Sequence, residues 1–259
     1  MTEQSNSFTS RIVKPDASAV IVTVCSDAGV GKTSFAATFP KPFFLRVEDG
    51  MQSIDSSPMP DTLPIADNAD QFFDDLLAFT QSEHDYKTLV IDSVTKLEIM
   101  FIDHVVKSDP KKPRSINQAL GGYGAGLRAV ASMHQRVRKA AEILKVKRGI
   151  NTVFIAHADT EMMDLPDTEP YMRFNLRLDK RSMQPYVDDV DIVGFIRLHT
   201  FLAGDDGSRK QARSDGSRIL TTYATPSNIS KNRFGITTDL DLPKGVNPLV
   251  EFVPALQQD

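Results

Sequence analysis

A short run of small and polar residues follows directly after an apolar segment of the sequence. The apolar segment is residues 19–25, and the run is Ser26, Asp27, Ala28, Gly29, Val30, Gly31, Lys32, Thr33 and Ser34. Its spacing matches the pattern G-x-x-x-x-G-K-[ST] except at the first position, where Ser26 replaces glycine. In that pattern, backbone N–H groups surround phosphates, the lysine reaches the β- and γ-phosphates and the hydroxyl ligates Mg²⁺. The run therefore predicts a nucleoside-triphosphate site centred on Lys32 and Thr33.

Carboxylates at the ends of two further apolar runs could complete such a site. Asp92 ends the run 89–91, where a Mg²⁺-organising acid belongs, although it could instead only cap the helix that follows. Glu48 and Asp49 follow the run 43–47. The carboxyl ends of parallel strands converge on a ligand, so one of the two could accept a proton from the water that attacks the γ-phosphate.

Alternating apolar and amphipathic segments must position these residues. The expected elements, in chain order, are strands at 19–25, 43–47, 88–92 and 152–156 and helices at 32–38, 67–81, 94–105 and 127–147, with a glycine-containing loop at 108–126. This alternation predicts an α/β fold with a mostly parallel, doubly wound sheet. Residues 192–201 and 219–224 are expected to pair around a turn at 204–207, as an antiparallel β extension.

Composition limits the class of protein. The chain has 259 residues, 41% hydrophobic and 25% charged, which excludes disorder for most of it. We expect a flexible N-terminal arm at 1–18 and a single domain at 19–259. The polar N-terminus and the absence of an apolar run near 18 residues predict no membrane segment and a cytoplasmic location. The net charge of −4 means that any nucleic-acid site must be a local patch.

Four segments in this order resemble the RecA-like recombination ATPases, and most nearly their phage-encoded branch of single-strand annealing proteins of the Sak-four type. They are residues 26–33, 44–48, 89–93 and 231–235. The last reads Lys-Asn-Arg-Phe-Gly, which is similar to the motif of RadA whose cations reach toward ATP held by the adjoining subunit. The resemblance implies a RecA-like P-loop core and ATP and Mg²⁺ as ligands.

The same resemblance implies roles for residues outside the loop. Glu48 matches the catalytic carboxylate, Lys231 and Arg233 match the trans-acting cations, and His157 falls where a polar residue senses the γ-phosphate. From the residues alone, Lys231 and Arg233 could instead decorate a solvated turn. His157 could equally be a core or rim residue satisfied by the backbone.

Single-stranded DNA is the macromolecular partner that the resemblance implies. The candidate DNA segments are residues 111–126, with Lys111, Lys112, Arg114 and Tyr123, and residues 159–184, with Tyr171, Arg173, Phe174, Arg177, Lys180 and Arg181. They combine cations for phosphates with aromatic stacking faces. Alternatively, they are a solvated loop and a hairpin whose aromatics pack inward.

The leading hypothesis is a Mg²⁺-dependent ATPase that binds single-stranded DNA and promotes annealing or recombination, with ATP at a subunit interface. Its further partners would be copies of itself and other recombination or single-strand-binding proteins, in the host cytoplasm if the chain is phage-encoded. Two alternatives stay open: a P-loop small-molecule (nucleotide) kinase, in which residues 173–181 form a lid, and a nucleotide-gated regulatory ATPase without DNA activity.

Overall fold

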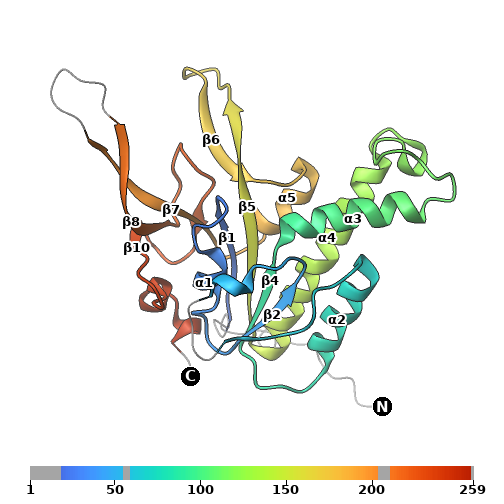
Figure 1. Ribbon diagram of the computed structural model, residues 1–259, viewed down its shortest axis with the longest axis horizontal. Helices are drawn as coiled ribbons and strands as arrows, with labels where there is room; N and C mark the ends of the chain where they lie inside the picture. The colour runs from blue at the N-terminus through green and yellow to red at the C-terminus, as the bar shows by residue number, and fades with distance from the viewer. Residues whose placement is uncertain (1–18, 55–58, 204–210, 258–259) are drawn as a thin grey trace, which may run out of the picture.

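The computed structural model describes residues 19–54, 59–203 and 211–257, which form a β-sheet with helices against its faces (Figure 1). The described strands are β1 Ile21–Ser26, β2 Pro42–Arg46, β3 Asp61–Thr62, β4 Thr88–Asp92, β5 Asn151–Met163, β6 Tyr171–Leu176, β7 Ile192–Ala203, β8 Gln211–Thr221, β9 Lys231–Asn232 and β10 Leu240–Asp241. The described helices are α1 Lys32–Ala36, α2 Ala69–Gln81, α3 Val94–Ser108, α4 Ala125–Ile143 and α5 Lys180–Val187. The predicted arm at 1–18 and the predicted turn at 204–207 lie outside the described residues.

The sheet is mixed, with a parallel centre. Its strand order is β10-β8-β7-β1-β5-β4-β2-β3, while β6 pairs with β5 and β9 with β7. β1 is parallel to both β5 and β7, and β4 is parallel to both β5 and β2. The β7–β8 and β8–β10 pairs are antiparallel. The predicted α/β fold class, a mostly parallel sheet with an antiparallel extension, is therefore confirmed.

Each face of the sheet has its own apolar core. Along β1, Val22 and Val24 face α1, whereas Ile21 and Cys25 face the layer of α2, α3 and α4. This alternation follows from the two-residue period of a strand, and it explains why the run is apolar throughout. The chain end also covers the α1 face, because Leu256 belongs to the core on that side. Among the described helices, none is both long and apolar enough to cross a membrane.

The connection from β4 to α3 is abrupt, and it fixes the position of Asp92. α3 begins two residues after Asp92, and the hydroxyl of Ser93 caps it by accepting the N–H of Lys96 at 3.3 Å. Ser, Thr, Asp and Asn are favoured at this position because they satisfy free N–H groups of the first turn. The alternative in which Asp92 itself only caps the helix does not match this geometry, since Ser93 takes that role.

The strand predicted at 152–156 is longer than expected. β5 continues to Met163, and beyond His157 it pairs with β6 instead of β1. The alternative interpretation of residues 159–184 as containing a hairpin matches this pairing, although the charged and methionine-rich sequence does not itself mark where the strands begin and end. This β5–β6 hairpin projects beyond the sheet (Figure 1). The same region also contains α5, which the sequence did not predict.

Some cations of α4 and the turn after it contact neighbouring elements, whereas others, such as Lys139, are exposed. The guanidinium of Arg138 donates to the carbonyl of Asp189, and Lys145 forms an ion pair with Asp191 at 2.6 Å. Arg136 lies 4.0 Å from the centre of the Phe73 ring. These contacts tie α4 to the start of β7 and to α2. Periodicity places a charge on a helix face, but it does not reveal which neighbour meets that face.

Candidate functional site

The strand ends predicted to converge lie at one edge of the sheet. In the parallel register, Ser26 at the end of β1 pairs with His157, and Asp92 at the end of β4 pairs with Ile155 and with Arg46. Glu48 lies two residues beyond Arg46. In the sheet, β5 lies between β1 and β4, so Asp92 comes from the second strand away from β1.

The loop between β1 and α1 encloses its own lysine. Gly29 and Gly31 have φ angles of 76° and 104°, in the region that favours glycine. Lys32 is only 6% exposed, and its Nζ donates to the carbonyls of Ser26 at 3.1 Å and Asp27 at 2.9 Å. The Ser26 hydroxyl, at the position where the pattern has glycine, donates to the Asp27 carbonyl and lies 3.3 Å from Nζ. Burial lowers the pKa of Lys32, and nearby carboxylates partly oppose this.

Thr33 and Asp92 are in direct contact. The Thr33 hydroxyl donates to Asp92 Oδ2 at 2.9 Å, and Asp92 is 2% exposed. Burial raises the pKa of Asp92 to about 6 against the effect of that hydrogen bond. A Cβ on Gly50 would lie 3.3 Å from Asp92 Oδ2 and 3.5 Å from Thr33 Oγ1, so glycine leaves space open beside both oxygens.

This donor set fits Mg²⁺. Mg²⁺ binds proteins through one or two oxygen ligands and completes its shell with water and phosphate oxygens. Thr33 and Asp92 supply one hydroxyl and one carboxylate, and a bound cation would favour the charged form of Asp92. The part of the chain that the structure describes contains no group of three or more His, Cys, Asp or Glu residues that could hold a metal ion.

Glu48 and His157, predicted separately, form a pair. His157 Nε2 lies 3.1 Å from Glu48 Oε1, and the His157 backbone N–H donates to the hydroxyl of Thr95. Burial acts to raise the pKa of Glu48, but hydrogen bonds from His157 and Ser93 outweigh it and hold that pKa below its usual value. Asp49 instead contacts Arg46 and Gln52 outside this pair.

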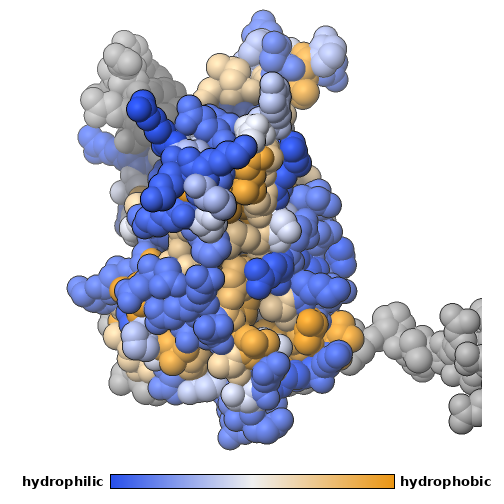
Figure 2. All heavy atoms as spheres, turned by 90° about the vertical axis from the view of Figure 1, so that its right-hand side faces the viewer, coloured by the Kyte–Doolittle hydropathy of each residue, from blue (hydrophilic) through white to orange (hydrophobic). Residues whose placement is uncertain are grey.

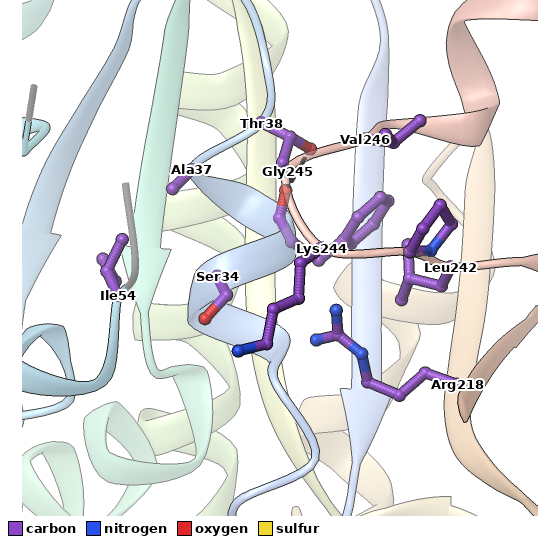
Figure 3. A pocket seen from close by; sticks show the side chains of 11 residues that line it. Ser34, Ala37, Thr38, Ile54, Arg218, Leu242, Lys244, Gly245 and Val246 are labelled. Carbon is purple, nitrogen blue, oxygen red and sulfur yellow. Dashed lines mark hydrogen bonds between the residues drawn. The ribbon is translucent and has the colours of Figure 1, made fainter. Parts of the chain in front are cut away.

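These groups line a cavity of about 490 Å³. One wall comes from residues that the sequence did not single out: Leu198, Gly216, Arg218 and Lys244. They come from β7, β8 and the segment after β10. The sequence could not identify them, because each is a single residue that belongs to no recognisable motif. A second cavity of about 180 Å³ adjoins the first, since Ser34, Arg218 and Lys244 line both (Figure 3). Its other lining residues include Phe35, Ala37, Leu242 and Val246.

Lys231 and Arg233 are not in this cavity. β9 pairs with the first residues of β7, and Ile192 there pairs with Val22 near the start of β1. The loop that holds Lys32 lies at the other end of β1. Lys231 Nζ donates to the carbonyl of Asp188, and Arg233 lies 3.3 Å from a carboxylate oxygen of Asp191. Neither cation can reach the nucleotide site of its own chain.

The two candidate DNA segments lie next to each other. Arg181 Nη2 is 3.7 Å from the position that a Cβ on Gly124 would occupy, and Tyr123 is 98% exposed. Phe174 packs inward, with its ring centre 5.0 Å from that of Phe195. The cations of the second segment all have partners within the chain: Arg173 with Asn228, Arg177 with Ala158, Lys180 with Glu161 and Arg181 with Asp179. The first segment is thus the more available of the two.

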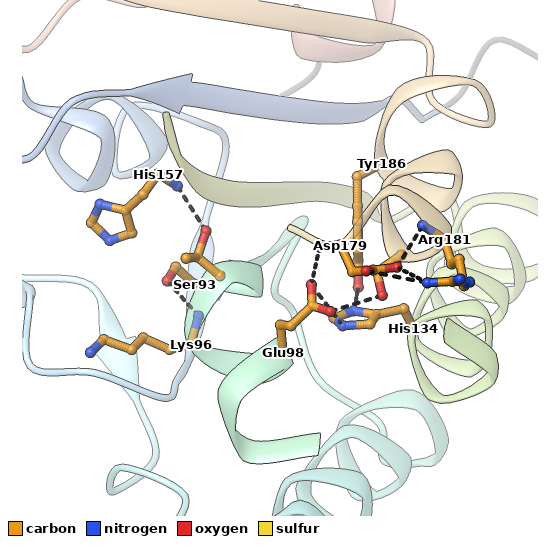
Figure 4. A network of polar contacts seen from close by, with 10 residues as sticks. Ser93, Lys96, Glu98, His134, His157, Asp179, Arg181 and Tyr186 are labelled. Carbon is orange, nitrogen blue, oxygen red and sulfur yellow. Dashed lines mark hydrogen bonds and ion pairs between the residues drawn. The ribbon is translucent and has the colours of Figure 1, made fainter. Parts of the chain in front are cut away.

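A buried polar network connects α3 with α4 and α5 (Figure 4). Glu98 accepts the N–H of Asp179 at 3.0 Å and the hydroxyl of Ser182 at 3.1 Å, and His134 Nδ1 is hydrogen-bonded to the hydroxyl of Tyr186 at 2.7 Å. Burial raises the pKa of Glu98 to about 7 and lowers that of His134 to about 3. The network thus ties α5 to the helix that follows β4.

The chain belongs to a family described as an AAA domain, AAA_24, whose match spans residues 18–234. Among solved structures, a KaiC-like protein from the hyperthermophilic archaeon Pyrococcus horikoshii is similar, with 12% identity, coverage of 86% of this chain and 89% of that chain, and a TM-score of 0.44. A search of curated proteins found no match. The family membership supports the coarser part of the resemblance, a P-loop ATPase, while the single-strand annealing branch stays a prediction.

Proposed function

We propose that this protein is a Mg²⁺-dependent ATPase. The observation that carries the proposal is the contact between Thr33 and Asp92 at the base of a cavity whose floor is the Lys32 loop. A hydroxyl and a carboxylate from distant parts of the chain meet where the phosphates of a nucleotide would lie. If residues 26–33 were only a glycine-rich surface loop, this contact between Thr33 and Asp92 would not be expected.

Five polar side chains of the cavity have a part in the proposed reaction. Lys32 binds the β- and γ-phosphates, and Thr33 and Asp92 hold Mg²⁺, which neutralises phosphate charge when bound. A water attacks the γ-phosphorus, the bond to the β–γ bridging oxygen breaks, and ADP leaves with that oxygen. Glu48 accepts the proton of the attacking water, and His157 holds the Glu48 carboxylate in place through the contact of 3.1 Å.

The second cavity supports a place for the nucleotide base. It adjoins the phosphate cavity at Ser34, and apolar side chains such as Phe35 and Val246 line much of it. Ligand sites are commonly apolar with a few polar groups that fix orientation. A nucleotide whose phosphates lie against the Lys32 loop would thus direct its base toward α1 and the segment after β10.

Nucleotide binding and phosphate release test the ATPase proposal. Lys32→Ala and Asp92→Ala should abolish hydrolysis, measured as free phosphate from ATP with Mg²⁺. Lys32→Ala removes a cation that contacts the transferred phosphoryl group, and Asp92→Ala removes a carboxylate that would hold Mg²⁺. The exposed residues Lys139 and Asp85 supply matched controls, Lys139→Ala and Asp85→Ala. Absence of nucleotide binding to the wild-type chain in calorimetry with Mg²⁺ would refute the proposal. A phosphorylated acceptor in place of free phosphate would favour a kinase.

The position of Lys231 and Arg233 supports self-association with ATP at the interface. They lie at the sheet edge opposite to the cavity, so any action on ATP must be on a nucleotide held by another copy. Two copies arranged head to tail would bring the Arg233 edge of one toward the cavity of the next. The γ-phosphate charge of the transition state can be stabilised by a cation from a second chain.

Single-stranded DNA is the proposed macromolecular ligand, and residues 111–126 are the candidate contact. The loop between α3 and α4 lies at the end of the helices that projects from the body of the molecule (Figure 1). On the side of the molecule that α2, α3 and α4 present, hydrophilic residues lie on either side of a band of hydrophobic ones (Figure 2). Tyr123 in this loop is exposed and available for stacking on a base.

A gel-shift titration with single-stranded DNA tests this contact. We expect affinity to fall as salt rises, with a linear log–log slope, because phosphate contacts release counterions. Tyr123→Ala should weaken binding by about 1–3 kcal/mol, which is the usual contribution of one stacked base. Tyr223→Ala, outside both segments, is the matched aromatic control. Failure of the wild-type chain to bind at low salt would contradict the DNA proposal and leave the ATPase proposal intact.

A further inference from the structure

Arg218 lies on β8 with its backbone fixed on both sides. It is opposite Leu198 of β7, and its carbonyl accepts the N–H of Leu242 at 2.9 Å. Two residues further along β8, Leu220 is fully buried in the core that also contains Phe35 of α1. Side chains two positions apart point to the same face of a strand. Arg218 therefore points to the α1 face of the sheet, and it lies nearer to the Lys32 loop than Leu220 does.

An irregularity in β8 immediately before Arg218 opens the wall of the cavity. The pairing moves from Leu198 with Arg218 to Thr200 with Ser214, so β8 advances four residues while β7 advances two. The additional residues form a local turn in which Asp215 accepts hydrogen bonds from both the N–H and the hydroxyl of Ser217. Bulges beside functional sites commonly redirect side chains. Here the bulge places Gly216, which has no side chain, at the cavity.

The guanidinium of Arg218 lies over the Lys32 loop. A side chain on Gly31 would collide with Arg218 Nη1. Glycine at this position therefore allows the guanidinium to come close, and it also allows the left-handed backbone conformation of residue 31. The Arg218 residue is half-buried, and its guanidinium has no hydrogen bond or ion pair with any residue that the structure describes. It lines both cavities. A planar cation with five N–H donors is thus presented to the ligand space without a partner among the residues that the structure describes.

The position of Arg218 selects among the phosphates. Thr33, Glu48 and Asp92 line the first cavity only, whereas Arg218 lies where the two cavities meet. If the base occupies the second cavity, the phosphates nearest to this junction are the α- and β-phosphates. We infer that Arg218 is a phosphate-binding residue that acts within its own chain and contacts the phosphates shared by ADP and ATP. The inference rests on the nucleotide site proposed above.

Calorimetry with ADP and with a non-hydrolysable ATP analogue, both with Mg²⁺, tests this role. Arg218→Met keeps the aliphatic stem against Gly31 and removes the charge. It should raise the Kd of both nucleotides by the same factor, on the order of ten- to a hundredfold, as expected for lost hydrogen bonds to a charged group. Arg218→Lys should recover part of the affinity. Arg213→Met is the matched control, because Arg213 is exposed on the same strand and does not line either cavity.

Two results would overturn the inference or its assignment. Binding by Arg218→Met equal to that of the wild type would show that the guanidinium does not hold phosphate. A much larger loss for the ATP analogue than for ADP would move Arg218 to the γ-phosphate. If Arg218→Met does not fold, as judged by its melting temperature, Arg218→Gln replaces it as the neutral variant. Absence of binding to the wild-type chain would instead refute the nucleotide site itself.

Discussion

The pair of Glu48 and His157 decides how the candidate site could activate water. Glu48 alone is a carboxylate after a strand, and His157 alone is a polar residue in a strand. Their separation of 3.1 Å distinguishes Glu48 from the neighbouring Asp49, and in the proposed reaction His157 would position Glu48. The lowered pKa of Glu48 keeps it ionised, and therefore able to accept a proton, at neutral pH.

Glu48→Gln should separate turnover from binding. Because it removes the proton acceptor and keeps the shape of the side chain, kcat should fall by about 10²–10⁴ while the nucleotide Kd stays near that of the wild type. Steady-state phosphate release and calorimetry measure the two quantities. Asp49→Asn is the control and should have a much smaller effect. A kcat within twofold of the wild type for Glu48→Gln would assign proton acceptance to another group.

At the scale of elements, the network around Glu98 joins helices that come from distant parts of the chain. The carboxyl group is 8% exposed and receives two hydrogen bonds from the region where α5 begins. His134, whose pKa is lowered to about 3, is neutral at physiological pH and supplies no countercharge. Burial of an ionisable group without a countercharge favours its neutral form, which explains the raised pKa of Glu98.

The unfolding free energy should therefore depend on pH through Glu98. Folded, Glu98 keeps its proton up to a pKa of about 7, whereas its ordinary pKa is 4.5. Between these values the folded state binds more protons, so this contribution to stability falls as pH rises. Glu98→Gln removes the ionisation, so relative to the wild type the variant should gain about 1–3 kcal/mol between pH 4.5 and pH 8.

Urea unfolding of both proteins across this pH range measures the difference. Glu142→Gln, an exposed glutamate of α4, controls for the loss of one acid. A difference between the wild type and Glu98→Gln that is constant with pH would show that Glu98 titrates normally.

At the scale of the whole molecule, the two groups of candidate residues lie at opposite ends of β1. The Lys32 loop lies at one end, and the Lys231–Asn232 strand pairs with β7 at the other. A single copy cannot bring both ends to one nucleotide. Hydrolysis assisted by Arg233 would then require association of several copies. The rate of hydrolysis would therefore depend on the protein concentration and on binding of the copies to a common DNA strand.

Arg233→Ala should impair turnover and spare nucleotide binding. If Arg233 stabilises transition-state charge on a neighbour's ATP, turnover should fall by roughly 10³-fold or more. Folding should change little, because the Arg233 side chain is 62% exposed and Asp191 keeps its ion pair with Lys145. Arg197→Ala, which breaks another surface ion pair, is the control.

Mixing two inactive variants provides the sharper measurement. Lys32→Ala supplies an intact Arg233, and Arg233→Ala supplies an intact nucleotide cavity. A mixture of the two should regain phosphate release as mixed assemblies form, because one copy completes the site of the other. No gain on mixing, together with normal turnover by Arg233→Ala alone, would contradict action between subunits.

The sequence by itself determined the parts of this protein that depend on local spacing. The loop from Ser26 to Thr33, the strand that ends at Asp92 and the alternation of strands and helices follow from glycine conformation, apolar runs and periodicity. Those features were enough to predict an α/β P-loop fold, the residues around Lys32 and a carboxylate at Glu48 or Asp49. The choice of Glu48 and the role of His157 came from the resemblance to RecA-like ATPases.

Only the tertiary structure decided which distant residues meet. The contact of Glu48 with His157, the approach of Arg218 to Gly31, and the separation of Arg233 from the cavity all depend on strand order and register. A strand's pattern tells which face a side chain occupies, but not which strand lies beside it. The extension of β5 and the wall formed by β7 and β8 arise for the same reason, since pairing with a neighbour supplies the order that the local sequence does not encode.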